Sequence, residues 1–256
     1  MSELLSIRGL THRFGGLQAV SALELSLAEG EIAGLIGPNG AGKTTVFNLV
    51  SGFYVPSEGD ILFRGERLNG LKPHEVSARK IGRTFQNIRL WGEMTVLDNI
   101  KIARHSRLGY GLADAFFRTS RYRDAEARID REARELLEVF RLQDLAEECP
   151  KNLPYGTQRR VEIARALSLD PDLLLLDEPA AGIGASDVVE LIDYIKWIHS
   201  TFGLTIWMIE HQMQVIMTLC QSITVIDFGA EIARGGPDDI RNDPRVIKAY
   251  LGDGAL

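Results

Sequence analysis

A glycine-rich segment, Gly37-Pro-Asn-Gly-Ala-Gly-Lys-Thr44, carries lysine and threonine at the spacing that suits phosphate and magnesium chemistry. It follows an apolar run, Glu31–Ile36, that is expected to be a strand, and a helix is predicted from Lys43 onward. Backbone N–H groups of such a loop, together with the positive end of the helix dipole, bind phosphate. We therefore expect Lys43 to reach the β- and γ-phosphates of a nucleotide and the Thr44 hydroxyl to coordinate Mg²⁺.

A chance glycine turn is the alternative to this phosphate-binding loop. At average composition, about one chain of this length in a hundred would contain the pattern by chance. The strand before the loop and the helix after it make chance rarer still. The predicted phosphate-binding residues are Gly37, Pro38, Asn39, Gly40, Ala41, Gly42, Lys43, Thr44 and Thr45.

Two adjacent carboxylates follow a second apolar run. Leu173–Leu176 predicts a buried strand, and Asp177 and Glu178 come directly after it. In α/β sheets, ligands bind at the carboxyl ends of the strands. Asp177 therefore suits a Mg²⁺ site, and Glu178 suits a base that polarises an attacking water. Taken alone, the pattern fits a strand running out to solvent equally well, but beside a phosphate-binding loop the catalytic interpretation is favoured.

Gln86 and His211 stand near the ends of two further apolar runs, Ile81–Phe85 and Leu204–Ile209. A polar residue at a strand end is usually a surface residue, and taken alone both would be interpreted in that way. Each gains a functional interpretation only from the other motifs of the chain.

The composition is that of an ordinary globular protein. The 256 residues carry a formal net charge of −6 with a pI near 5.5, and 45% are hydrophobic. This balance favours neither nucleic acid nor an anionic membrane surface, although a local basic patch remains compatible with it. No apolar run approaches the about 18–20 residues that span a bilayer, and the N-terminus lacks the features of a secretory signal. Cys149 and Cys220 lack metal-type spacing and are interpreted as reduced thiols.

Alternating strands and helices must position these groups. Strands are predicted at Leu4–Leu10, Val20–Leu27, Glu31–Ile36, Ile61–Arg64, Ile81–Phe85, Leu173–Asp177, Leu204–Ile209 and Ser222–Asp227. Helices are predicted from Lys43, at Thr95–Arg104, Ala125–Leu142, Gly156–Leu169, Ser186–Ser200 and Gln212–Leu219, and as two short pieces after Pro237. The later alternation implies a mainly parallel sheet flanked by helices, interrupted by a helical insert over roughly Thr95–Leu167. The stretch Arg107–Arg123 shows no clean period.

The ordered motifs resemble those of the ABC (ATP-binding cassette) ATPases over nearly the whole chain. The A-loop, Walker A, Q-loop, signature, Walker B and H-loop correspond to Phe14-Gly-Gly, the glycine-rich loop, Thr84-Phe-Gln86, Leu153-Pro-Tyr-Gly-Thr-Gln158, Asp177-Glu-Pro179 and Glu210-His211. The set in order is far more specific than any single motif.

The resemblance implies an α/β fold: a P-loop NTPase core with a mainly parallel sheet, an N-terminal antiparallel β portion and an α-helical subdomain. Residues 1–256 would form a single ABC ATPase domain. Within it, 1–94 and 168–236 would be the catalytic core, 95–167 the helical subdomain with the signature, and 237–256 a tail.

The resemblance also implies ATP hydrolysis with ATP and Mg²⁺ as cofactors. Phe14 would stack on adenine, Gln86 would contact Mg²⁺ and the attacking water while sensing the membrane partner, and His211 would contact the γ-phosphate. The predicted catalytic residues are Glu178, His211, Gln86 and Lys43, and the predicted Mg²⁺ ligands are Thr44, Gln86 and Asp177. The signature residues Pro154, Tyr155, Gly156 and Thr157 would bind the γ-phosphate held by the opposite subunit, a task that suits the N–H groups of a helix N-terminus.

Two positions depart from the family's pattern. The signature usually reads Leu-Ser-Gly-Gly-Gln, and Pro154 replaces its serine, which removes a hydroxyl and an N–H donor. The contact with the opposite γ-phosphate must therefore rest on the backbone near Gly156. The D-loop usually ends in aspartate, and Gly184 stands there, so communication between the two sites is expected to be altered.

The chain is most similar to the ATPases of branched-chain amino acid importers. The resemblance rests on Arg13-Phe-Gly-Gly-Leu17, on the insert around Gly109–Arg123, and on the ending Asn242-Asp-Pro-Arg-Val-Ile-Lys-Ala-Tyr-Leu-Gly252. ATPases of urea, amide or other amino acid importers and of a lipopolysaccharide exporter remain alternatives, as does a non-transport ABC ATPase. The chain has neither the long coiled-coil insert of the repair members nor the second cassette of the translation factors.

The implied partners are a second ATPase subunit, in a homodimer or heterodimer, and transmembrane permease subunits, with a substrate-binding protein acting indirectly and no nucleic acid. The chain would then lie at the cytoplasmic face of the inner cell membrane, held through the permease. The segment Asn87–Val96 contains Leu90, Trp91 and Met94. It is predicted either to receive a short permease helix or to pack between the two subdomains.

Overall fold

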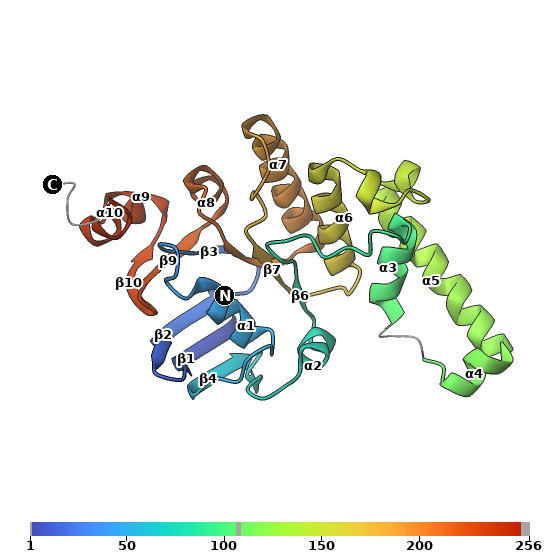
Figure 1. Cartoon of the computed structure of the whole chain (residues 1–256), viewed down its shortest axis with the longest axis horizontal. Helices are drawn as coiled ribbons and strands as arrows, with labels where there is room; N and C mark the ends of the chain where they lie inside the picture. The colour runs from blue at the N-terminus through green and yellow to red at the C-terminus, as the bar shows by residue number, and fades with distance from the viewer. Residues whose placement is uncertain (1, 106–108, 252–256) are drawn as a thin grey trace. The chain divides into compact units, whose positions relative to one another are not determined.

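The computed structural model describes residues 2–105 and 109–251 (Figure 1). The chain divides into two compact units: unit 1 comprises Met1–Gln86 and Asp172–Leu256, and unit 2 comprises Asn87–Pro171. Within the described ranges, no helix is both long and apolar enough to cross a bilayer.

An antiparallel sheet of four strands opens unit 1, with the strand order β2-β1-β4-β5. The strands are β1 (Glu3–Phe14), β2 (Leu17–Ala28), β4 (Glu58–Phe63) and β5 (Glu66–Arg67). In β2, the buried Leu23, Leu25 and Leu27 alternate with exposed residues, so one face of the strand packs on the core. The predicted antiparallel portion is confirmed.

A second sheet of six strands carries the site and has the order β10-β9-β3-β8-β7-β6. The strands are β3 (Ile32–Ile36), β6 (Ile81–Arg83), β7 (Leu173–Asp177), β8 (Thr205–Ile209), β9 (Ser222–Asp227) and β10 (Ala230–Gly235). All but β10 run parallel, and every residue of β3, β7 and β8 is buried, which explains their unbroken apolar runs. Because Ile209 is level with both Leu35 and Asp177, the carboxyl ends of these three strands meet at one edge.

The helices of unit 1 fix the loops that follow the strands. They are α1 (Lys43–Val50), α2 (Pro73–Ala78), α7 (Ala185–Phe202), α8 (Met213–Leu219), α9 (Pro237–Asn242) and α10 (Pro244–Leu251). Phe47 of α1 packs fully buried against Trp207 of β8, with ring centroids 4.9 Å apart, and so anchors α1 to the parallel sheet. 

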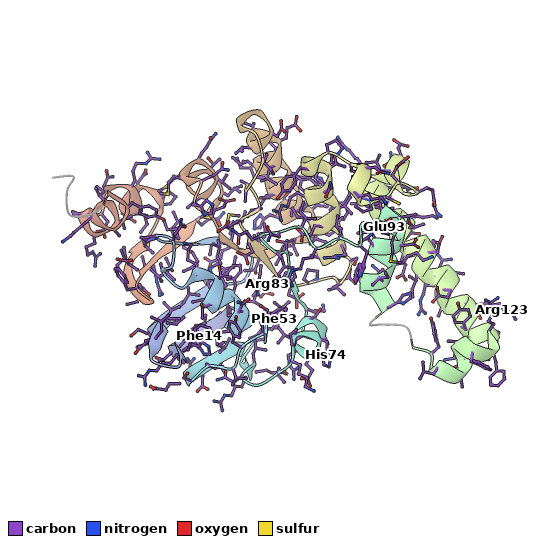
Figure 2. All side chains as sticks on the ribbon, viewed as in Figure 1. Phe14, Phe53, His74, Arg83, Glu93 and Arg123 are labelled. Carbon is purple, nitrogen blue, oxygen red and sulfur yellow. The ribbon has the colours of Figure 1, made fainter. Side chains whose placement is uncertain are left out.

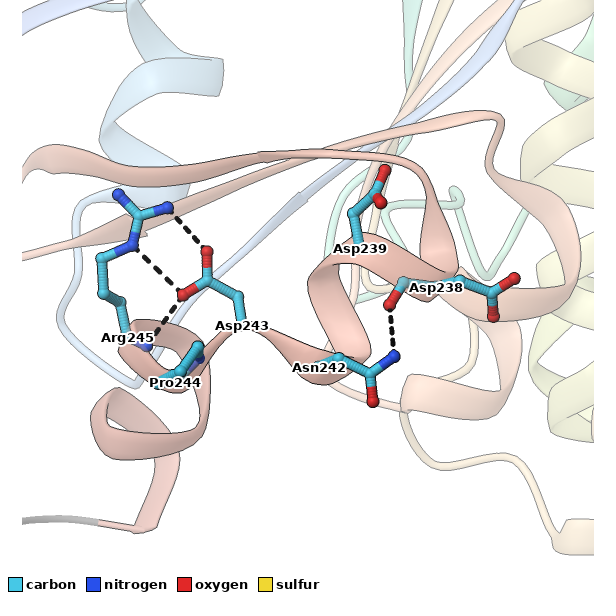
Figure 3. A pocket seen from close by; sticks show the side chains of 6 residues that line it. All are labelled: Asp238, Asp239, Asn242, Asp243, Pro244 and Arg245. Atoms are coloured by element: carbon cyan, nitrogen blue, oxygen red, sulfur yellow. Dashed lines mark hydrogen bonds and ion pairs between the residues drawn. The ribbon is translucent and has the colours of Figure 1, made fainter.

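Residue Asp243 makes the turn between the last two helices (Figure 3). Its carboxylate accepts hydrogen bonds from the Arg245 backbone N–H at 2.8 Å and from the Arg245 guanidinium at 2.6 Å. The guanidinium holds the pKa of Asp243 below its usual value. The two short helices predicted after Pro237 are therefore separate, as expected.

Unit 2 is helical. It contains α3 (Val96–Arg104), α4 (Leu112–Phe117), α5 (Ser120–Val139), the 3₁₀ helices η2 (Gln143–Leu145) and η3 (Pro150–Asn152), and α6 (Tyr155–Leu167). The predicted cap of α3 is confirmed, because the Thr95 hydroxyl accepts a hydrogen bond from the Asp98 N–H at 3.0 Å.

The structure corrects several predicted boundaries. Helix α5 (Ser120–Val139) begins five residues before the predicted start at Ala125 and ends three residues before the predicted end at Leu142. Thr119 caps its N-terminus, and Arg141 adopts a left-handed φ of +54° just beyond its end. Strand β6 ends at Arg83, not at Phe85, so Gln86 follows a short non-strand segment. Helix α4 and strand β10 were not predicted. Residues 107 and 108 of the aperiodic stretch lie outside the described residues.

Unit 2 extends beyond the predicted helical subdomain 95–167. Asn99 of α3 is fully buried, and its side chain accepts from the Trp91 N–H at 2.9 Å and donates to the Trp91 carbonyl at 3.1 Å. These bonds tie the segment before Thr95 to the helices, which explains why 87–94 belongs with unit 2.

Candidate active site

The glycine-rich loop between β3 and α1 has a shape that its glycines require. Gly37, Gly40 and Gly42 adopt φ values of +156°, +83° and +103°. A Cβ at Gly37 would lie 2.0 Å from the Ile226 carbonyl oxygen, and a Cβ at Gly42 would lie 2.3 Å from that of Ala19. Larger residues at these two positions would push the loop off the strands that support it.

The positive charge of Lys43 lies inside this loop. Its ammonium donates to the carbonyl oxygens of Gly37 at 2.7 Å and Pro38 at 2.9 Å, and the residue is buried. Burial lowers the pKa of Lys43, whereas the carboxylates of Glu178 and Asp177 raise it. Gly42 precedes α1 without a capping side chain, so the first N–H groups of the helix and the lysine form one anion-attracting concavity.

Asp177 ends β7 with only 2% of its surface exposed. One carboxylate oxygen, Oδ2, is 2.9 Å from the Arg83 guanidinium. The other, Oδ1, is buried and has no hydrogen-bond partner among the described residues. An unpartnered buried carboxylate oxygen is a ready acceptor for a metal ion or for a water bound to one.

Arg83 is a residue of the site that the sequence analysis missed. Besides Asp177, its guanidinium donates to Asn48 at 2.9 Å and to Ser51 at 2.6 Å, both near the end of α1. It also lies 5.6 Å from the centre of the Phe53 ring, as Figure 2 allows the reader to follow. Arg83 thus joins β6, β7 and α1. The available signal was an arginine inside an otherwise apolar strand.

The second carboxylate, Glu178, contacts both polar residues that follow other strands, Gln86 and His211. The Gln86 side-chain amide donates to one carboxylate oxygen at 2.6 Å, and His211 Nδ1 lies 3.4 Å from the other. Glu178 is 8% exposed and has a left-handed φ of +50°, a conformation uncommon for a residue with a side chain. The structure therefore brings Gln86, Glu178 and His211 together.

Glu210 holds the backbone around this cluster. It is fully buried, and its carboxylate accepts from the N–H groups of Ala180 at 2.7 Å, His211 at 3.0 Å and Gln212 at 3.1 Å. The Gln212 side chain returns a hydrogen bond to the Ala180 carbonyl at 3.0 Å. Glu210 thereby positions both the chain after Glu178 and the chain that carries His211.

Phe14, the predicted adenine contact, ends β1 and is 43% exposed. Its ring packs edge-on against His12 at 4.5 Å and Tyr54 at 5.3 Å between centroids, and His12 stacks on Tyr54 at 5.5 Å. The three rings hold one another in place while Phe14 keeps part of its surface open to solvent.

The C-terminal helix also reaches the glycine-rich loop, which the sequence analysis did not predict. Burial raises the pKa of Tyr250 on α10, and a hydrogen bond with the Gly37 backbone lowers it. A hollow of about 740 Å³ lies between the loop and this helix and is lined by Pro38–Ala41, Asp227, Phe228, Glu231, Ile232, Arg245, Lys248 and Ala249.

The predicted signature residues lie in unit 2, at the start of α6. Pro154 is the residue before the helix, Tyr155 is exposed, and Gly156 and Thr157 lie in the first turn. No side-chain hydrogen bond caps this helix, so the N–H groups of its first turn have no capping side chain as a partner. The Tyr155 hydroxyl accepts from Arg159 at 3.2 Å, and Arg159 pairs with Glu162 at 2.7 Å inside the unit.

Comparison with known proteins agrees with this geometry. The ABC transporter family model matches residues 20–181, and one described as branched-chain amino acid ATP-binding cassette transporter matches residues 231–255. The high-affinity branched-chain amino acid transport ATP-binding protein LivG of Escherichia coli K12 is 44% identical over 98% of both chains. BraF of Pseudomonas aeruginosa, which has the same description, is 42% identical over 98% of both chains.

Two solved structures are similar throughout. A nucleotide-free ATP-binding cassette from an ABC transporter has a TM-score of 0.85 and 28% identity, covering 98% of this chain and all of its own. A cassette in the ADP conformation has a TM-score of 0.85 and 27% identity, covering 99% of this chain and all of its own. The chain therefore belongs to the ABC transporter family, as one of its ATP-binding and ATP-hydrolysing members, and the predicted fold class is confirmed.

Replacing Lys43 by Ala should lower phosphate release by about a hundredfold or more, because the β- and γ-phosphates lose their main cation. A malachite-green assay on the purified variant would measure this. Lys80→Ala is the matched control, since Lys80 is an exposed lysine of the same unit that pairs with Asp172. Unchanged turnover in Lys43→Ala would show that hydrolysis takes place elsewhere.

Replacing Phe14 by Ala should weaken ATP binding by roughly 1–3 kcal/mol, the range for stacking of a base on an aromatic ring. Phe14→Tyr keeps the ring and should bind nearly as wild type. Titration with a fluorescent ATP analogue measures both variants. If Phe14→Ala binds ATP like the wild type, the ring serves only the contacts with His12 and Tyr54.

Proposed function

We propose that this chain is the ATPase subunit that drives uptake of branched-chain amino acids. The observation that carries the hydrolytic part is the placement of Glu178 between Gln86 and His211, at the same sheet edge as the Lys43 loop. The transported substrate is inferred from the names of the relatives LivG and BraF and from the match of residues 231–255. 

Each site residue has a defined task in hydrolysis. Lys43 and the loop N–H groups hold the β- and γ-phosphates. Glu178 orients and polarises the attacking water, Gln86 contacts that water, and His211 contacts the γ-phosphate. Glu210 keeps His211 and the turn after Glu178 at fixed positions through its three backbone hydrogen bonds.

Asp177, Thr44 and Gln86 would hold Mg²⁺. The ion prefers one or two protein oxygens together with phosphate oxygens and water, and the buried Oδ1 of Asp177 supplies such an oxygen. Held by these residues, Mg²⁺ would supply neutralisation of the charge that develops on the phosphates. Arg83 keeps the second oxygen of Asp177 engaged, so the carboxylate is already oriented.

A complete site would be shared by two subunits. The start of α6, from Pro154 to Thr157, would bind the γ-phosphate held by a second ATPase subunit, identical or different. The Pro154 backbone has no N–H, so the N–H groups of the first turn around Gly156 would make this contact. Permease subunits would hold the pair at the cytoplasmic face of the inner membrane, and a substrate-binding protein would act indirectly.

Transport assays test the substrate. Affinity capture from native membranes should recover permease subunits, and cells producing the captured complex should take up labelled leucine. Competition by unlabelled urea or amides, without competition by isoleucine or valine, would contradict branched-chain amino acid import.

Glu178→Gln should stabilise an ATP-bound dimer. The amide keeps the shape of the side chain but cannot accept a proton from water, so ATP should persist between two subunits. Sedimentation velocity with Mg-ATP should show the dimer for the variant, with its proper second subunit added if the pair is mixed. Hydrolysis at the wild-type rate would remove Glu178 from the role of base, and a monomer in every nucleotide state would contradict the shared site.

Trp91→Ala should uncouple the chain from the permease. Trp91 is 48% exposed and lies under the Arg165 guanidinium at 5.3 Å, so it is not a core side chain of unit 2. Its loss should leave basal ATPase activity of the isolated protein within about twofold, as expected for a surface residue, and should weaken both permease co-purification and uptake. Trp91→Phe keeps an aromatic surface and is the matched control. Lost basal activity with intact permease capture would assign Trp91 to folding instead.

A further inference from the structure

Helix α4 exposes almost all of its apolar surface. Leu112, Phe116 and Phe117 are 92%, 82% and 75% exposed, and no residue of this helix is buried. The two phenylalanine rings contact each other edge-on at 5.1 Å between centroids. Apolar side chains grouped in this way on a surface mark an interaction site more often than singly scattered ones do.

Polar contacts hold α4 in place, so its exposure is not the fraying of a loose segment. The Asp114 carboxylate accepts from the Gly111 N–H at 3.2 Å and from the Thr119 hydroxyl at 2.9 Å, which fastens both ends of the helix. Just before α4, the Tyr110 hydroxyl donates to Glu126 of α5 at 2.6 Å. The side chains that make these contacts are polar, whereas the apolar side chains of α4 remain exposed to solvent.

Three arginines follow the exposed rings directly. Arg118, Arg121 and Arg123 are exposed, and within the described part of the chain none of them forms an ion pair. Between Gly109 and Arg123 the only acidic residue is Asp114, whose pKa is lowered by the hydrogen bonds from Gly111 and Thr119 and by the charge of Arg121. Asp124 follows Arg123 directly, so the group carries three arginines against these two acids. Figure 2 shows Arg123 projecting from the start of α5, at the end of unit 2 where α4 lies.

The remainder of α5 has the opposite character. Further along the helix, Arg128 pairs with Glu132, and Arg134 pairs with Asp130 and with Glu147. Arg131 of the same helix has no ion pair among the described residues, but Arg118, Arg121 and Arg123 are the exposed arginines that stand next to the rings in the chain. The chain as a whole has a net charge of −6, so the positive charge around Arg118, Arg121 and Arg123 is opposite in sign to that of the whole chain.

We propose that Leu112, Phe116, Phe117, Arg118, Arg121 and Arg123, the arginine–aromatic tip, bind the surface of a bilayer that contains anionic phospholipids. Leucine and phenylalanine on one side and arginines on the other are the composition of interfacial membrane-binding segments. The apolar side chains would enter the boundary between headgroups and acyl chains, and the guanidinium groups would pair with lipid phosphates. A segment this short binds weakly, so it would add to attachment through the permease rather than replace it.

This surface goes beyond the proposed transport function, because it requires neither nucleotide nor permease. The test is flotation of the purified full chain with vesicles of phosphatidylcholine alone and of phosphatidylcholine mixed with phosphatidylglycerol. We expect binding to the mixed vesicles only, with release at high salt. Replacing the three arginines by Gln should weaken this binding roughly a hundredfold. Each basic residue near an anionic surface strengthens binding by somewhat less than tenfold, and three such losses are combined.

Two further variants separate the contribution of the apolar side chains of the tip from non-specific adsorption of the protein to vesicles. The triple variant Leu112→Ser, Phe116→Ser, Phe117→Ser should also lose binding to mixed vesicles, about tenfold or more. Val189→Ser is the control for loss of an exposed apolar side chain, because Val189 of α7 is 52% exposed and is followed by Glu190, outside both the phosphate-binding loop and the arginine–aromatic tip. It should bind as the wild type does. All variants should keep wild-type ATPase activity, which shows that they fold.

Three outcomes would overturn the proposal: no binding of the wild type to either vesicle, equal binding to both vesicles, or full binding by the arginine and serine variants. If those variants still bind vesicles but lose permease co-purification, the tip is a protein contact. Failure of lipid binding leaves the ATPase assays of Lys43 and Glu178 untouched, so the transport function and this proposal fail separately.

Discussion

Negative charge at the end of a buried strand is the constraint on which the rest of the site depends. Strand β7 is covered on both faces, and its continuation places Asp177 and Glu178 where only 2% and 8% of their surfaces reach solvent. Buried carboxylates destabilise a fold unless donors or cations face them. Arg83 faces Asp177, and Gln86 and His211 face Glu178, so three partners from two neighbouring strand ends meet this need.

Backbone conformation makes the same arrangement possible. Glu178 turns the chain with a left-handed φ of +50°, and its N–H remains bonded to the Ile209 carbonyl at 2.9 Å. Such a conformation costs on the order of 1–3 kcal/mol and persists only where the surroundings fix it. Glu210 does so by accepting one hydrogen bond from Ala180, two residues after Glu178, and another from His211 on the segment that follows β8. In the phosphate-binding loop, Gly37 and Gly42 also have positive φ values and lie close to neighbouring backbone, and both are tolerated because glycine has no Cβ.

Bulk charge describes the average surface and not its local patches. A net charge of −6 does not favour an anionic membrane surface, yet exposed arginines and exposed rings gather at α4. The reason is that net charge averages over the whole surface, while association depends on the charge within about a Debye length of the contact. The aperiodic stretch that contains α4 was the part of the sequence least informative about structure, because a helix of six residues shows no repeat.

The sequence by itself determined the parts that depend on neighbouring residues. The apolar runs gave β3, β7 and β8, Thr95 marked the start of α3, and the glycine and lysine spacing identified the phosphate-binding loop. The family resemblance, not the local pattern, grouped Gln86 and His211 with Glu178. Only the tertiary structure decided which atoms meet: Arg83 with Asp177, Asn99 with Trp91, and Glu210 with Ala180. Local periodicity reports which face of an element is buried, whereas these contacts depend on strand order and on how the chain returns, and both are set by packing across the whole fold.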